Sequence, residues 1–146
     1  TFPSIDANSI TKALQQAEDT TLSYGLTTIV DAGLSKEHIL LIDSLQQSKD
    51  FKTRLYTMIQ NEQDDIDYFL DRGILKTKHL NVRSVKVYAD GALGSRGAAL
   101  KETYSDQANH FGSMVIGLTE FEALAQKLKA SPFQIHIHFE NFHKIN

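Results

Sequence analysis

The most informative segment of the sequence is residues 85–100, which read Val85-Lys86-Val87-Tyr88-Ala89-Asp90-Gly91-Ala92-Leu93-Gly94-Ser95-Arg96-Gly97-Ala98-Ala99-Leu100. It begins as an apolar strand with a lysine in its middle, then breaks into a loop that holds three glycines, an acid and an arginine. In a buried parallel strand a lysine costs free energy unless its ammonium is paired or chemically changed. Carboxylation by carbon dioxide is one such change, because it converts the amine into an anionic metal ligand.

Short apolar strands alternate with amphipathic helices on both sides of this stretch. The pattern predicts strands near residues 26–31, 53–60, 83–90 and 133–138. Helical spacing of apolar residues predicts helices between them and one before the first strand. Such alternation implies right-handed crossovers and a parallel sheet. By pattern alone, the four strands fit either a small open α/β sheet or half of a (β/α)8 barrel.

Three local signals refine this outline. Ser35 is placed to cap the helix that follows it, and Thr119 with Glu122 has the spacing of a capping box. Asp31 and Gly33 follow the first strand, and we expect them to form the turn that ends it. No repeat, low-complexity segment or domain linker interrupts the chain.

The composition excludes several classes of function. The 146 residues carry a net charge of -3 and include no cysteine. Disulfides, thiolate metal sites and a cysteine nucleophile are therefore excluded. The charges are dispersed, so the sequence offers no basic surface for nucleic acid or an anionic membrane. No apolar run approaches the roughly 20 residues of a membrane span. We expect a cytoplasmic protein.

The run KVYADGALGSRGAAL, which starts at Lys86, resembles the amidohydrolase superfamily in its branch of YtcJ-like and N-substituted-formamide-deformylase-like metal-dependent hydrolases. The resemblance implies an α/β fold of parallel β/α units, corresponding to about half of a TIM (β/α)8 barrel (strands 2–5 of the family fold). Residues 1–138 would form this partial barrel domain. Residues 139–146 depart from the family pattern and form an atypical tail, so we expect a truncated chain.

The resemblance also implies metal ligands. In amidohydrolases with two metals, a carboxylated lysine from the fourth strand bridges the ions, and Lys86 has a similar sequence setting. The segment Gln134-Ile-His-Ile-His138 resembles the fifth-strand motif, in which a histidine at the strand end binds metal. His138 aligns with that histidine. The alternatives are a Lys86 ammonium that pairs with a carboxylate or reaches solvent, and strand histidines that only form hydrogen bonds.

The substrate would be held by residues next to the proposed metal ligands. In an alternating strand Lys86, Tyr88 and Asp90 share one face. Tyr88, Asp90 and Arg96 are the candidate substrate-binding residues, and Arg96 could bind a carboxylate or carbonyl oxygen. The alternative for the last two is that Asp90 pairs with Arg96 and braces the loop. A further histidine, His143, lies in the tail.

Together these features predict a metal-dependent hydrolase of C–N bonds in amides, formamides or cyclic amides. It would use one or two divalent ions, zinc being the expected metal, in the complete enzyme. The family's first-strand histidine pair, a later histidine and the general-base aspartate have no counterpart in these 146 residues, so we assign no catalytic residue. The alternative is a non-catalytic α/β fragment that associates with a partner chain or with itself. A half-barrel exposes strand edges, so we expect a homo-oligomer.

Overall fold

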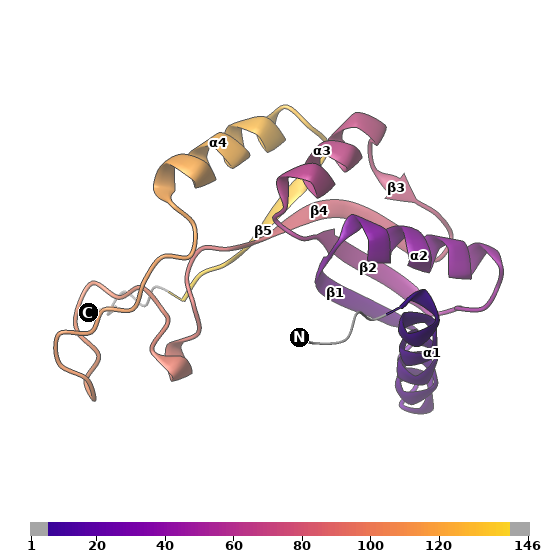
Figure 1. The fold of residues 1–146 in the computed structure, drawn as a ribbon, viewed down its shortest axis with the longest axis horizontal. Coiled ribbons are helices and arrows are strands. Elements are labelled where there is room, and N and C mark those ends of the chain that lie inside the picture. The colour runs from indigo at the N-terminus through magenta and orange to yellow at the C-terminus, as the bar shows by residue number, and fades with distance from the viewer. Residues whose placement is uncertain (1–5, 141–146) are drawn as a thin grey trace. The chain divides into compact units, whose positions relative to one another are not determined.

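The computed structural model describes residues 6–140 (Figure 1), and these divide into two compact units on either side of the boundary between Ser84 and Val85. Strand β4 (Leu80–Tyr88) belongs to both units, because the boundary falls between Ser84 and Val85. The first unit contains the N-terminal β/α elements. The second contains the glycine-rich loop and the C-terminal strand.

The first unit is a sheet covered by helices. Its elements are α1 (Ala7–Ser23), β1 (Thr28–Leu34), α2 (Lys36–Gln47), β2 (Arg54–Ile59), α3 (Gln63–Arg72), β3 (Leu75–Lys76) and the first half of β4. The strand order is β1-β2-β4-β3. Strands β1 and β2 pair in parallel, whereas the short β3 pairs with β4 in the antiparallel direction.

Apolar residues of α2 and α3 form the core of the first unit together with alternate residues of the strands. The fully buried members are Ile39 and Ile42 of α2, Ile66 and Phe69 of α3, and Ile59 of β2. Each such side chain contributes about 1.5–3 kcal/mol by leaving water. The predicted cap of α2 is confirmed, because the Ser35 hydroxyl accepts a hydrogen bond from the His38 N–H at 3.4 Å.

Helix α1 is attached differently, since none of its residues is buried. One carboxylate fixes it to the rest of the unit. Glu18 Oε1 accepts hydrogen bonds from the backbone N–H groups of Lys52 and Thr53, both at 2.6 Å, and from the Thr53 hydroxyl at 2.9 Å. The helix is therefore held by polar contacts more than by packing.

The second unit is built on the end of β4 and strand β5 (Gln134–His138), which pairs with it. A 3-10 turn (η1, Leu93–Ser95) and helix α4 (Leu118–Lys129) lie between them in sequence. The buried side chains are mainly small or aliphatic: Val85, Val87, Ala89, Ala98, Ile116, Leu124 and Leu128, with Tyr104 and Phe133. The loop between β4 and α4 is fixed by backbone pairing, including Leu100 N–H to Phe111 O at 2.8 Å and a bridge between Asp90 and Met114.

The α/β fold class is confirmed, but two details of the predicted outline are wrong and one short strand was missed. The first strand does not end at a turn formed by Asp31 and Gly33; it continues to Leu34 through a register shift, with Gly33 at φ 130°. Thr119 does not cap α4. The helix starts at Leu118, two residues before the predicted start, with Gly117 as its N-cap, so the Thr119 hydroxyl already lies within the first turn. The two-residue β3 was not predicted.

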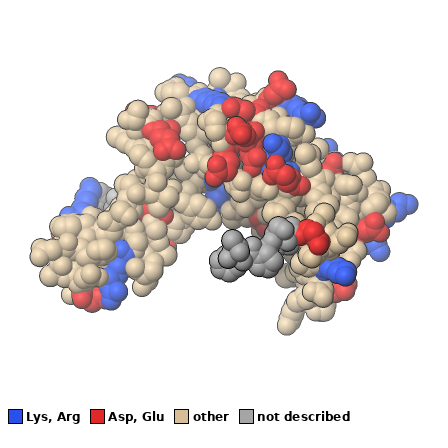
Figure 2. Space-filling view, in the orientation of Figure 1, with Lys and Arg blue, Asp and Glu red and all other residues tan. Residues whose placement is uncertain are grey.

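The charged side chains are unevenly spread over the first unit. On the face drawn in Figure 2, acidic side chains gather near α3, whose sequence includes Asp64, Asp65, Asp67 and Asp71. Asp65 accepts hydrogen bonds from the Lys36 backbone N–H and the Gln60 amide, so part of this charge supports the fold. Within residues 6–140, no helix combines the length and apolar character needed to cross a membrane.

Candidate functional site

Lys86 and Tyr88 lie on one face of β4, as strand alternation predicts. Val85 and Val87 point to the opposite face and are fully buried, whereas Lys86 is half-buried and Tyr88 is exposed. The Lys86 ammonium lies 4.1 Å from the centroid of the Tyr88 ring, a distance at which a cation is attracted to the π face. Burial lowers the pKa of the Lys86 amine from its ordinary value of 10.5. Among the described residues Lys86 makes no salt bridge, so the carboxylate pairing considered as an alternative is not formed there.

His138 ends β5, directly beside the end of β4. Its backbone carbonyl accepts a hydrogen bond from the Ala89 N–H at 2.9 Å. Its imidazole lies against Tyr88, with the two ring centroids 5.7 Å apart. Because Lys86 and His138 both contact Tyr88, at 4.1 and 5.7 Å, the ammonium lies within about 10 Å of the imidazole centroid. The two predicted metal ligands therefore lie beside the same tyrosine, on paired strands.

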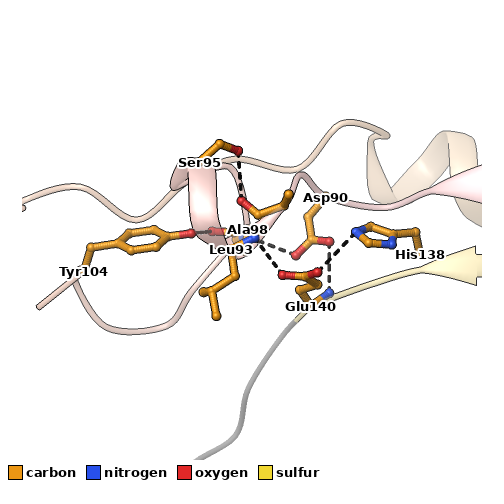
Figure 3. A network of polar contacts seen from close by, with 9 residues as sticks. Asp90, Leu93, Ser95, Ala98, Tyr104, His138 and Glu140 are labelled. Carbon is orange, nitrogen blue, oxygen red and sulfur yellow. Dashed lines mark hydrogen bonds and ion pairs between the residues drawn. The ribbon is translucent and has the colours of Figure 1, made fainter.

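Glu140 is a member of this cluster that the sequence analysis missed. Its Oε1 lies 3.7 Å from His138 Nε2, and its Oε2 accepts a hydrogen bond from the Leu93 backbone N–H at 2.6 Å (Figure 3). The 3.7 Å separation is that of an ion pair with a protonated imidazole and is longer than a hydrogen bond. The signal was present in the sequence, since residues 138 and 140 are two apart, but Glu140 was assigned to the atypical tail.

Asp90 lies beyond the end of β4 and is 1% exposed. Its Oδ2 accepts a hydrogen bond from the Ala99 N–H at 3.0 Å, and its Oδ1 accepts one from the Glu140 N–H at 3.1 Å (Figure 3). The carboxylate thus joins the glycine-rich loop to the segment after β5. These contacts give Asp90 a structural role, and contact between Asp90 and a substrate stays a prediction.

Arg96 does not pair with Asp90, so that alternative is wrong. Its guanidinium forms a two-pronged contact with Asp106, with Nη2 to Oδ2 at 2.8 Å. The Arg96 hydrogen bond lowers the pKa of the Asp106 carboxyl. Arg96 adopts a left-handed backbone with φ 59°, and its carbonyl lies 2.8 Å from His110 Nε2. The Arg96 guanidinium, which was expected to bind substrate, is therefore already paired with Asp106.

The cluster supplies only part of a metal-ligand set. Within residues 6–140, no group of three histidine, cysteine or acidic side chains is placed to hold a metal ion. His138 offers an imidazole nitrogen of the kind a divalent ion accepts, whereas Lys86 would add a ligand only as a carbamate, through its oxygens. They therefore fit a partial site. His143, the further histidine of the tail, lies outside the described residues.

Comparison with known proteins gives a match in fold. The structure is similar to an uncharacterized metal-dependent hydrolase from Pyrococcus furiosus, with a TM-score of 0.79 and 19% sequence identity. An uncharacterized metal-dependent hydrolase from Pyrococcus horikoshii OT3 gives the same TM-score at 18% identity. Each match covers 92% of this chain but only 29% and 28%, respectively, of the hydrolase. The chain has the fold of one segment of these proteins.

The sequence is 28% identical to Protein LONG AFTER FAR-RED 3 of Arabidopsis thaliana in an alignment 140 residues long, and the match covers 87% of this chain. The chain spans 24% of the length of that curated relative. No protein-family model matches the sequence. The comparisons therefore establish a partial hydrolase-like fold. The eight-stranded barrel and the amidohydrolase branch stay predictions.

Proposed function

We propose that this chain forms part of a metal-dependent hydrolase that acts on C–N bonds of amides, formamides or cyclic amides. The observation that carries the proposal is the cluster of Lys86, Tyr88 and His138 at the ends of two paired strands. The fold shared with two metal-dependent hydrolases supports it. Active sites of β/α barrels gather at the carboxyl ends of the strands, which is where His138 lies.

Lys86 and His138 would hold the divalent ion, with zinc as the expected metal. Burial lowers the pKa of the Lys86 amine, and this favours the neutral amine, which is the form that adds carbon dioxide. The addition forms one N–C bond and releases one proton, leaving a carbamate whose oxygens can bind metal. Glu140 would orient the His138 imidazole by moving from its present 3.7 Å to hydrogen-bond distance. A bound ion would supply a water of lowered pKa and polarise the substrate carbonyl.

Tyr88 would line the substrate site, because its ring lies near both the Lys86 ammonium and the His138 imidazole and is half exposed. Asp90 would act on the site indirectly by fixing the backbone of Glu140 and Ala99. Arg96 would reach a substrate only by leaving Asp106. The substrate-binding roles of these three residues are part of the proposal, as is a cytoplasmic location.

A second candidate is a non-catalytic α/β fragment that associates with a partner chain or with itself. Large exposed apolar side chains favour it: Val30 on β1 is 61% exposed, and Val115 and Leu118 are 66% and 72% exposed. Unpaired strand edges and apolar surface recruit other chains. Light scattering at several protein concentrations tests this candidate, and a monomer at every concentration would contradict it.

Metal binding in the presence of bicarbonate tests the first proposal. We expect the chain to bind zinc weakly, and 13C-labelled bicarbonate to give a carbamate signal that disappears in Lys86→Arg. His138→Gln should weaken zinc binding, while the matched control His110→Gln should not. A carbamate signal retained in Lys86→Arg, or zinc binding unaffected by both Lys86→Arg and His138→Gln, would contradict the assignment.

Activity is expected to be poor in the isolated chain, because it spans less than a third of the hydrolases it matches. A metal-bound water without a general base loses a contribution of about 10²–10⁴-fold. Metal-loaded protein assayed on formamides and N-acyl compounds measures this. Turnover that Lys86→Ala abolishes would mean that the chain alone holds a working site.

A further inference from the structure

A second candidate site lies in the first unit, under helix α1. A cavity of about 590 Å³ separates α1 from β1, α2 and the start of β2. Its walls are mostly aliphatic and aromatic: Ile10 and Leu14 of α1 face Ile29, Leu34, Ile42 and Phe51. The volume falls within the range of about 300–1,000 Å³ typical of small-molecule sites.

The polar groups of this cavity are acidic. Of the residues that the structure describes, Asp31 and Glu18 line it, together with Ser9, Thr21 and His38, and no lysine or arginine does. Glu18 already accepts three hydrogen bonds at the base of α1. Asp31 is therefore the carboxylate available to a ligand, and the lining carries negative charge without a cationic side chain to balance it.

Asp31 is placed in the cavity by the register of β1. It pairs with Thr57 and lies on the same face as Ile29, two residues before it. Burial raises the pKa of the Asp31 carboxyl, and a hydrogen bond from the Gly33 backbone acts in the opposite direction. An ionised carboxylate against apolar walls gains free energy when a cation approaches it.

We propose that this cavity binds a small apolar molecule carrying one protonated amine, with Asp31 as its counter-ion. The aliphatic walls would hold the apolar body, and the carboxylate would accept the N–H groups of the ammonium. Two observations select this ligand class: the apolar lining and the unbalanced negative charge. The cavity includes neither Lys86 nor a metal ligand, so this proposal is independent of the proposed hydrolase function.

The test is a titration of isotope-labelled chain with cyclohexylmethylamine, followed by backbone NMR. Cyclohexylmethanol serves as the matched neutral probe. We expect shifts at α1, β1 and Phe51, and binding of the amine at least tenfold tighter than binding of the alcohol. Equal binding of both probes, or no shifts at these positions, would overturn the proposal. So would loss of binding at high protein concentration, which would indicate that a second copy fills the cavity.

Variants measure separately how the Asp31 carboxylate and the apolar walls contribute to the affinity. Asp31→Asn should lower the affinity for the amine at least tenfold and leave the affinity for the alcohol unchanged. Leu14→Trp should fill the cavity and weaken both probes, with the spectrum of the second unit confirming that the chain is folded. Asp64→Asn on α3 is the matched control and should change neither affinity. Unchanged amine affinity in Asp31→Asn would overturn the role of the carboxylate.

The pH dependence gives an independent readout. Affinity for the amine should fall as acid protonates Asp31, whose pKa is raised above 3.8. The other titratable groups that line the cavity are Glu18 and His38. His38→Gln should therefore leave the acid-side loss of affinity in place, and a profile that becomes flat in this variant would contradict the assignment to Asp31.

Discussion

Replacing Asp90 tests how the glycine-rich loop is held. Asp90 is buried, and each of its carboxylate oxygens accepts one backbone N–H, from Ala99 at 3.0 Å and from Glu140 at 3.1 Å. Hydrogen bonds to a charged group contribute about 1.5–3 kcal/mol each. Asp90→Asn keeps the side-chain volume and one oxygen, so it should cost about one such bond. Asp90→Ala leaves both N–H groups without this acceptor and should cost roughly twice as much, about 3–6 kcal/mol.

Amide hydrogen exchange measures this loss at the two donors themselves. Because about 1.4 kcal/mol corresponds to a factor of ten, Asp90→Asn should speed exchange at Ala99 or Glu140 by about tenfold to a hundredfold. Asp90→Ala should speed it at both. Asp106→Asn is the control, since it breaks an exposed contact in the same loop and should leave both amides protected. Unchanged exchange at Ala99 and Glu140 in Asp90→Ala would refute the bracing role.

Three further substitutions give separate tests. Gly112→Ala should destabilise the second unit, because backbone strain at φ +69° costs about 1–3 kcal/mol and the new Cβ would also lie 1.9 Å from the Ala98 carbonyl oxygen. Thermal unfolding checks this, and Gly94→Ala, where the new Cβ meets no atom within 4 Å, is the neutral control. The pKa of Lys86 is lowered in the folded chain from its ordinary value of 10.5, which applies to the unfolded chain. At pH values between these two pKa values the unfolded chain binds more protons than the folded chain, so the stability of the fold should rise with pH. Urea unfolding of Lys86→Met across that window should lack this rise. Since the pKa of Asp31 is raised from 3.8, stability is lost as pH rises through the folded-state pKa. Asp31→Asn should therefore unfold at higher urea than the native chain at neutral pH, and the difference should shrink as pH falls toward 3.8.

The sequence predicted those parts of the fold that repeat with a period. Apolar residues at alternate or helical positions identified β1, β2, β4, β5 and the helices, because burial imposes that spacing. Strand β3 has two residues and cannot show a period. The continuation of β1 through Gly33 depends on pairing with β2, which is a tertiary contact. The error at Thr119 is a shift of two residues in the helix start, which the capping pattern does not resolve.

In the candidate site, too, the sequence predicted the contacts that follow strand alternation and missed those in irregular segments. Lys86 and Tyr88 share a face because a strand alternates, and this was predictable. Asp90 follows the strand end, where alternation stops, so its burial and its backbone contacts could not be predicted. The Arg96–Asp106 contact joins residues ten apart in an irregular loop, where no spacing rule applies.

The attachment of α1 determines the order in which the first unit opens. Since no side chain of α1 is buried, releasing the helix exposes little apolar surface and mainly breaks the contacts of Glu18. The core strands lose far more when they separate, so α1 detaches at a lower free energy than the sheet unfolds. A protease would then cut first near Gly25, with the sheet intact. Detachment of α1 also exposes the cavity that lies beneath it. The helix that forms one wall of the cavity therefore controls the entry of a molecule.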